Sequence, residues 1–150
     1  MKRIVPVVFV LAGLTALGCS STSSTASAAS TVSSLASNPL VSSLTSGLGL
    51  NTTQAVAGAG ALLGSAQQKL SPTDWKKVSD AVPASDTLVT EAKSLTGTTG
   101  NFGDVASLGG TFSKLGLSSQ QVSQLVPAVT GYVSKAAGPE VGSLLAGALK

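Results

Sequence analysis

Helix-start signals recur along this chain, and they constrain its fold more than any other feature. Asn38 and Ser71 are each followed by proline, the order of a helix cap and a first helical residue. Asn51 and Ser118 are each followed three residues later by glutamine, the spacing of a capping box. Runs that alternate β-branched with polar residues, which would indicate strands, are missing. The sequence therefore predicts an all-α fold.

These signals also place the individual helices. After the start at Asn38 we expect a helix to about Gly47, and Val82-Pro83 should end a later one. Thr96 to Asn101 contains two glycines and no large apolar residue, so it is the longest predicted loop. The first four predicted helices span residues 38–47, 51–69, 71–82 and 85–95.

The second half of the chain resembles the first at an offset of 67 residues. Leu48-Gly49-Leu50 recurs as Leu115-Gly116-Leu117, and each copy continues with a capping box, a long helix, a proline-started turn and a shorter helix. The copies span about residues 48–83 and 115–150, too few repeats for a solenoid. We predict a compact, pseudo-symmetric bundle of about six or seven short helices built from two related helical hairpins.

Both long helices carry stripes that should face other helices. In the first copy the stripe is narrow and made of small residues, namely Ala55, Ala59, Leu62 and Ala66. In the second copy the stripe consists of Val122, Leu125, Val126, Val129, Tyr132, Val133 and Ala136. Pro127 lies inside this helix and predicts a kink in it. We interpret Gly60 and Gly64 as positions of close packing between soluble helices. Leu62, Val126, Val129 and Tyr132 are candidates for an apolar cavity or interface.

The first residues have the layout of an export signal. Lys2 and Arg3 precede an apolar run from Ile4 to Leu17, too short for the ~20 residues that span a bilayer. Two cleavage sites compete: Ala26-Ser27-Ala28 has the form of an ordinary signal peptidase site, and Ala16 to Cys19 resembles a bacterial lipobox. Cleavage normally falls just after the apolar run, which favours the bond between Gly18 and Cys19.

The lipobox resemblance implies a fate for the only cysteine. Cys19 would become the first mature residue and carry a diacylglyceryl thioether and an amide-linked acyl chain, which anchor it in a membrane. Ser20, rather than aspartate, implies sorting to the outer membrane of a Gram-negative bacterium, with the domain facing the periplasm. Serine, threonine and alanine dominate residues 20–37, which predicts a flexible tether after Cys19 and a single helical domain over residues 38–150.

Composition excludes several kinds of function. After removal of residues 1–18 the net charge is +1, and the only adjacent basic pair is Lys76-Lys77. Nucleic-acid binding needs clustered lysine and arginine residues, so we do not expect it here. Histidine is absent and the acids form no calcium loop, so we expect no cofactor, no metal and no catalytic residue. Trp75, beside the two lysines, would more often cap the core than contact a membrane.

Two segments resemble a known bacterial family, the domain of unknown function 2780 of VcgC/VcgE type. They are LGLNTTQAVAGAGALLGSAQQKLSPTDWKKVSDAVP, from Leu48 to Pro83, and FSKLGLSSQQVSQLVPAVTGYVSKAAGPEVGSLLAGAL, from Phe112 to Leu149. The resemblance implies a secreted or envelope helical domain and supplies no substrate. We therefore expect a non-enzymatic lipoprotein that binds an unknown envelope protein. The alternatives are a carrier of small apolar ligands or lipids and an enzyme of unrecognised type.

Overall fold

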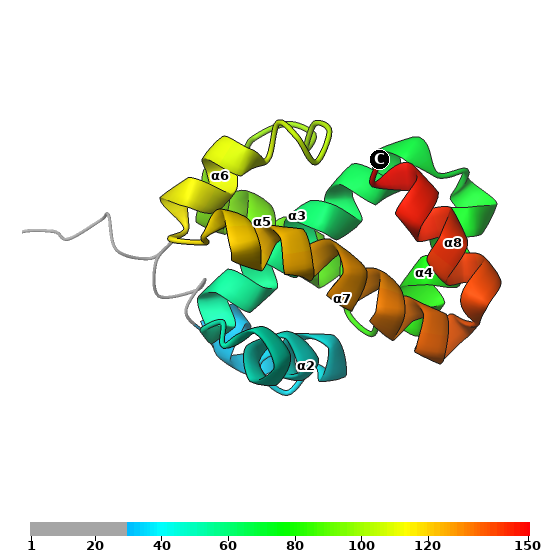
Figure 1. Cartoon of the computed structure of the whole chain (residues 1–150), viewed down its shortest axis with the longest axis horizontal. Coiled ribbons are helices and arrows are strands. Elements are labelled where there is room, and N and C mark those ends of the chain that lie inside the picture. Colours follow the sequence, from blue (N-terminus) through cyan, green and yellow to red (C-terminus); the bar gives the residue numbers. More distant parts are fainter. Residues whose placement is uncertain (1–29) are drawn as a thin grey trace, which may run out of the picture.

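The computed structural model describes residues 30–150, and within them helices are joined by turns and loops without any strand (Figure 1). A helical segment over residues 30–35 comes first. The helices that follow are α2 (Pro39–Leu48), α3 (Thr52–Lys69), α4 (Pro72–Ala81), α5 (Ser85–Thr96), α6 (Gly109–Lys114), α7 (Ser119–Ala137) and α8 (Pro139–Ala148). The predicted all-α bundle is confirmed.

The helices begin where the cap signals predict. Asn51 Oδ1 accepts a hydrogen bond of 2.8 Å from the Gln54 amide, and Gln54 Oε1 accepts one of 3.2 Å from the Asn51 amide. Ser118 and Gln121 form the same reciprocal pair at the start of α7. Each box satisfies two backbone donors that a helix start otherwise leaves without a partner. The starts of α3 and α7 are therefore decided by residues three apart in the sequence.

The loop between α5 and α6 begins where predicted but runs on to residue 108. Phe102 and Leu108 lie in this loop, and their side chains are 2% and 3% exposed. Gly97 has a left-handed backbone (φ 67°) that ends α5. The loop is longer than expected because two apolar side chains hold it on the core without helical structure.

The helical part begins earlier than the predicted domain boundary at residue 38. Val32 and Leu35, three residues apart on one face of the first segment, are 8% and 5% exposed. They join the main hydrophobic core, so the helical segment over residues 30–35 packs with the rest of the bundle. The predicted cleavage site at Gly18 and lipidation site at Cys19 lie outside the described residues.

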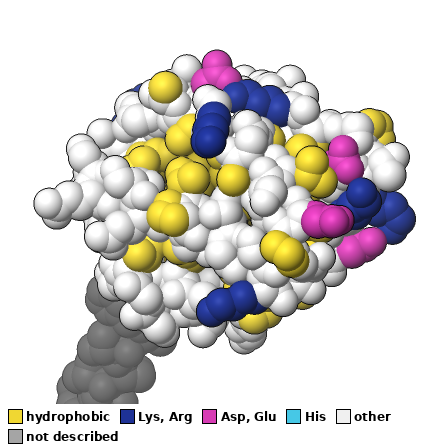
Figure 2. Space-filling model, turned by 45° about the vertical axis from the view of Figure 1, so that its right-hand side comes forward, with side chains coloured by type: hydrophobic (Ala, Val, Ile, Leu, Met, Phe, Trp, Pro, Cys, Tyr) yellow, Lys and Arg dark blue, Asp and Glu magenta, His cyan; other side chains and the backbone are white. Residues whose placement is uncertain are grey.

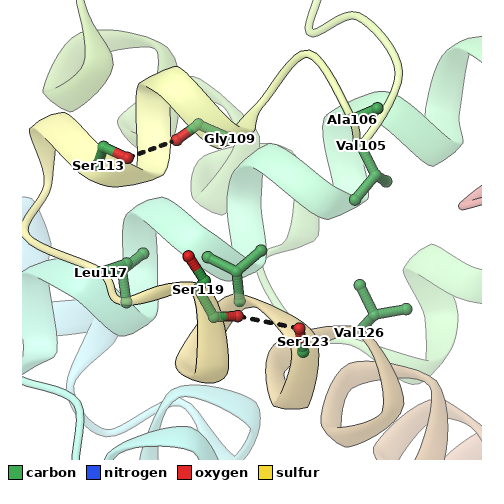
Figure 3. A pocket seen from close by; sticks show the side chains of 9 residues that line it. Val105, Ala106, Gly109, Ser113, Leu117, Ser119, Ser123 and Val126 are labelled. Carbon is green, nitrogen blue, oxygen red and sulfur yellow. Dashed lines mark hydrogen bonds between the residues drawn. The ribbon is translucent and has the colours of Figure 1, made fainter.

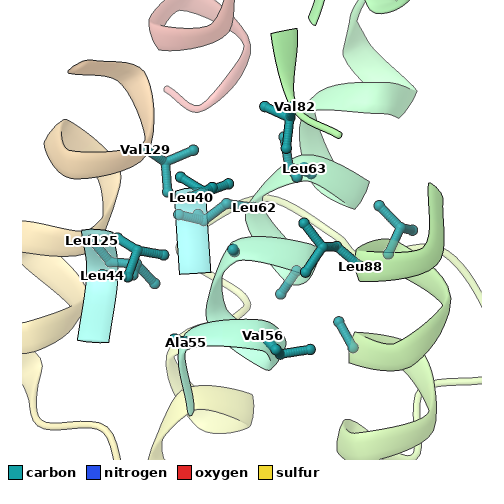
Figure 4. Close-up of a cluster of buried hydrophobic side chains, with 14 of the residues drawn as sticks. Leu40, Leu44, Ala55, Val56, Leu62, Leu63, Val82, Leu88, Leu125 and Val129 are labelled. Atoms are coloured by element: carbon teal, nitrogen blue, oxygen red, sulfur yellow. The ribbon is translucent and has the colours of Figure 1, made fainter. Parts of the chain in front are cut away.

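Helix α3 runs through the centre of the bundle. Every residue from Ala55 to Ala66 is buried, so α3 is covered on all faces rather than along the predicted stripe. Figure 4 shows Leu40 of α2, Leu88 of α5 and Val129 of α7 directed toward it from different sides. The prediction that α3 is buried only along a narrow stripe is therefore too limited. Its small residues let other helices approach α3 from several directions.

The glycines of α3 make the closest of these approaches. A Cβ built at Gly60 would lie 2.0 Å from the backbone oxygen of Leu88 in α5, and one at Gly64 would lie 2.4 Å from the Phe102 ring. Both distances are far below van der Waals contact, so only glycine fits. The interpretation of Gly60 and Gly64 as positions of close helix packing is confirmed.

The internal repeat is visible in the helix bounds. Thr52 and Pro72, which begin α3 and α4, correspond at the offset of 67 to Ser119 and Pro139, which begin α7 and α8. The packing differs, since α7 packs along α8, whereas α3 packs along α5 and meets α4 at few positions. The two hairpins are thus related in local structure, and the expected pseudo-symmetry does not extend to their packing.

Candidate functional site

An open groove of about 400 Å³ lies between the segment that carries α6 and the first half of α7 (Figure 3). Its apolar lining consists of Val105, Ala106, Leu117, Val122 and Val126. Its polar lining consists of the hydroxyl groups of Ser113, Ser119 and Ser123. No lysine or carboxylate lines it, so the groove presents apolar surface with a few hydroxyl groups to solvent.

Local structure explains how the side chains reach the groove. Val122 and Val126 are one helical turn apart on α7, as are Ser119 and Ser123, so all four lie on neighbouring rows of one helix face. Leu117 precedes the Ser118 cap. From the opposite side, α6 contributes Ser113, whose Oγ donates a 2.9 Å hydrogen bond to the Gly109 carbonyl.

Two of the groove serines have their hydroxyl protons engaged. Ser123 Oγ donates to the Ser119 carbonyl at 2.9 Å, and Ser113 Oγ donates to the Gly109 carbonyl within α6 at the same distance. These two hydroxyl oxygens can still accept hydrogen bonds from a bound molecule.

The structure separates the four residues predicted to line a cavity or interface. Leu62 and Val129 are fully buried and pack near Leu40 in the core (Figure 4). Val126 lines the groove, while Tyr132 is partly buried against the core farther along α7. Only one of the four therefore belongs to the groove. The apolar stripe of α7 is wide enough to contact two neighbouring parts of the structure, so some of its residues enter the core and others line the groove.

Sequence reasoning missed the opposite wall. Val105 lies in a loop, where no helical periodicity marks it, and Leu117 stands out in the sequence only as part of the repeated Leu-Gly-Leu motif. Ser119 and Ser123 flank the first residues of the apolar stripe of α7. These polar residues beside the stripe are the available signal that this face of α7 is not fully buried.

The surface of α4 forms no basic patch. Lys76 lies 3.3 Å from Asp80, and Lys77 lies 3.2 Å from Asp74, so each charge has a counter-ion. The Ser71 hydroxyl and Lys77 lower the pKa of Asp74. Trp75 is partly buried against the core, as expected of a cap on the core. Figure 2 shows parts of several hydrophobic side chains at the surface of one face, with charged side chains mostly toward its margins.

Two buried polar atoms in the described part of the chain have no hydrogen-bond partner, Ser65 Oγ and Glu91 Oε1. Burial raises the pKa of Glu91.

Within residues 30–150, His, Cys, Asp and Glu side chains form no group of three that could hold a metal ion. No helix in that range has the length and apolar character to cross a membrane.

A family model described as protein of unknown function VcgC/VcgE (DUF2780) matches residues 11–150. The match covers both repeat copies and the groove, and it confirms the resemblance drawn from the two quoted segments. Neither the curated proteins nor the solved structures contain a match to the chain. The comparisons therefore supply a family and no chemistry.

Proposed function

We propose that this chain, which belongs to the VcgC/VcgE family of proteins of unknown function, is a non-enzymatic binding domain held at the bacterial cell envelope. The observation that carries the proposal is the open apolar groove between α6 and α7. The groove binds the apolar surface of an envelope protein.

The shape of the groove favours a protein partner. Ligand pockets typically enclose most of a small molecule, whereas this groove is only partly enclosed and is larger than the pocket at the end of α3. Val122 and Val126 provide apolar contact, and the serine hydroxyl groups can accept hydrogen bonds at the rim. These are the features of a small protein-binding surface.

The anchor follows from the sequence. Acyl chains contribute about 0.8 kcal/mol per buried CH₂, so two or more chains on Cys19 hold a protein on a membrane where one would not. The outer membrane is the proposed location, with the helical domain in the periplasm. Residues 20–29 then connect the lipid to the first helical segment.

A carrier of small apolar ligands is the second candidate. The groove volume of about 400 Å³ is within the range of ligand sites, and its lining is mainly apolar. A carrier would hold a lipid or similar molecule after purification.

Crosslinking from inside the groove tests both candidates. A photoreactive residue replaces Val122 in cells, and the envelope is irradiated and analysed by mass. We expect discrete protein adducts that Val126→Asp removes, because a carboxylate in the apolar groove must be desolvated on binding. Ser143→Asp, at an exposed position of α8 outside the groove, is the matched control and should keep the adducts.

Circular dichroism would establish that both variants fold. Adducts with lipid alone would favour the carrier, and equal crosslinking from an exposed site on α4 would refute the groove as a binding surface. Fractionation of wild type and Cys19→Ala tests the anchor separately. An unchanged distribution between membrane and soluble fractions would refute lipidation at Cys19.

A further inference from the structure

Another pocket, with both polar and apolar lining, lies at the C-terminal end of α3, against the loop from Gly97 to Leu108. Its volume is about 210 Å³. It is lined by Ser65, Gln68 and Lys69 of α3 and by Phe102, Gly103 and Asp104 of the loop. Ser65 and Lys69 are one helical turn apart, so they lie on the same face of α3.

Ser65 is the polar group that this fold leaves unsatisfied at the pocket. The residue is 1% exposed, and its Oγ has no hydrogen-bond partner within the described part of the chain. Other helical serines here, such as Ser43 and Ser123, donate to the carbonyl four residues earlier. Since buried hydroxyl groups nearly always have a partner, an unsatisfied hydroxyl on a residue that lines a pocket indicates a ligand.

The wall of the pocket is held in place by hydrogen bonds. Gln68 Nε2 donates to the Phe102 carbonyl at 2.6 Å and to the Gly64 carbonyl at 3.2 Å. The Phe102 ring packs against Gly64, where a side chain would collide with it. The loop is thereby fixed next to α3, and Gly103 and Asp104 follow directly from this fixed point.

Opposite charges meet at the pocket. Lys69 Nζ lies 2.6 Å from Asp104 Oδ1, with the two side chains 34% and 65% exposed. A ligand with one charge could satisfy only one member of this pair. A ligand with an ammonium and a carboxylate group can pair with both, replacing one ion pair by two.

We propose that this pocket binds a small zwitterion of the α-amino acid type. The ligand ammonium pairs with Asp104, and its carboxylate pairs with Lys69 and accepts a hydrogen bond from Ser65 Oγ. The volume corresponds to about seven waters at ~30 Å³ each, which suits an amino acid with a small side chain. The site is separate from the groove, and the proposal does not depend on the proposed function.

Glycine is the probe for the test, with acetate and methylammonium as its two halves. The full chain carrying Cys19→Ala is titrated and followed by amide NMR shifts. We expect saturable shifts at Ser65, Gly103 and Asp104 with a Kd on the order of 1 mM for glycine, and at least about tenfold weaker binding of either half.

Three variants distinguish a binding role from a structural one. Ser65→Ala should weaken glycine binding about fivefold without lowering the melting temperature, because the hydroxyl has no partner to lose in the free protein. Lys69→Met should abolish saturation. Lys77→Met, which removes a surface pair with Asp74, is the matched control and should bind glycine as wild type does.

The proposal is overturned if glycine produces no saturable shifts up to roughly 100 mM, a concentration that would detect a site a hundredfold weaker than expected. It is also overturned if Ser65→Ala binds glycine as tightly as wild type, or if acetate with methylammonium reproduces the shifts at equal concentration.

Discussion

Replacing Gly60 by alanine should destabilise the chain, because Gly60 faces the backbone of α5 without space for a methyl group. The new Cβ would lie 2.0 Å from the Leu88 oxygen and 2.6 Å from the Ala92 Cβ. Carbon and oxygen approach to about 3.3 Å even in close contacts, so α3 and α5 would have to separate by roughly 1 Å. A backbone carbonyl cannot rotate away as a side chain can. The cost therefore lies near the upper end of overpacking, about 3 kcal/mol.

The helix propensity of alanine offsets about 1 kcal/mol of this cost, which leaves a net loss of about 2 kcal/mol. Gly131→Ala is the matched control, since Gly131 is the repeat equivalent of Gly64 and has nothing within 4 Å of the position that a methyl group would take. That variant should gain up to about 1 kcal/mol. Urea denaturation followed by circular dichroism measures both, with unchanged slopes expected. A Gly60→Ala midpoint equal to that of wild type would refute close packing of α3 on α5.

Three further predictions concern strain, charge and capping. Ala84 has a left-handed backbone (φ 59°), so Ala84→Gly should stabilise the chain by about 0.5–1 kcal/mol in thermal denaturation; a loss would show that the turn before α5 is not strained. Burial raises the pKa of Glu91, so the folded chain keeps this proton after the unfolded chain has lost it. Stability should therefore fall as pH rises from the ordinary pKa of glutamate through the raised one, and Glu91→Gln should remove this part of the slope; parallel profiles would contradict the assignment. Asn51→Ala removes the cap of α3 and should cost about 1 kcal/mol of unfolding free energy, whereas Thr53→Ala beside it leaves both capping hydrogen bonds in place and should cost much less.

The candidate groove was only partly predictable. The periodicity of α7 correctly placed Val126 on an apolar face, but the same periodicity included Val129, which is fully buried. A stripe shows that a face is apolar and does not show which neighbour covers each residue. The position of Val105 in the groove could not be predicted from the sequence. Val105 lies in a loop, and that loop is held in place by the Phe102 ring, which packs against Gly64 of α3.

The sequence by itself determined the starts of α2, α3, α4, α7 and α8 and the internal repeat, because a capping box or a proline start depends on residues no more than a turn apart. It did not mark the helical segment over residues 30–35 or α6, which begins without a side-chain cap. The tertiary structure decided which copy lies inside. Gly60 and Gly64 let α5 and Phe102 approach α3, so α3 is buried on every face. At the equivalent positions α7 has Pro127 and Gly131, and nothing lies within 4 Å of the place that a Cβ at Gly131 would take. Two similar local structures thus became a core helix and a groove-lining helix, because burial depends on long-range contacts that local signals do not specify.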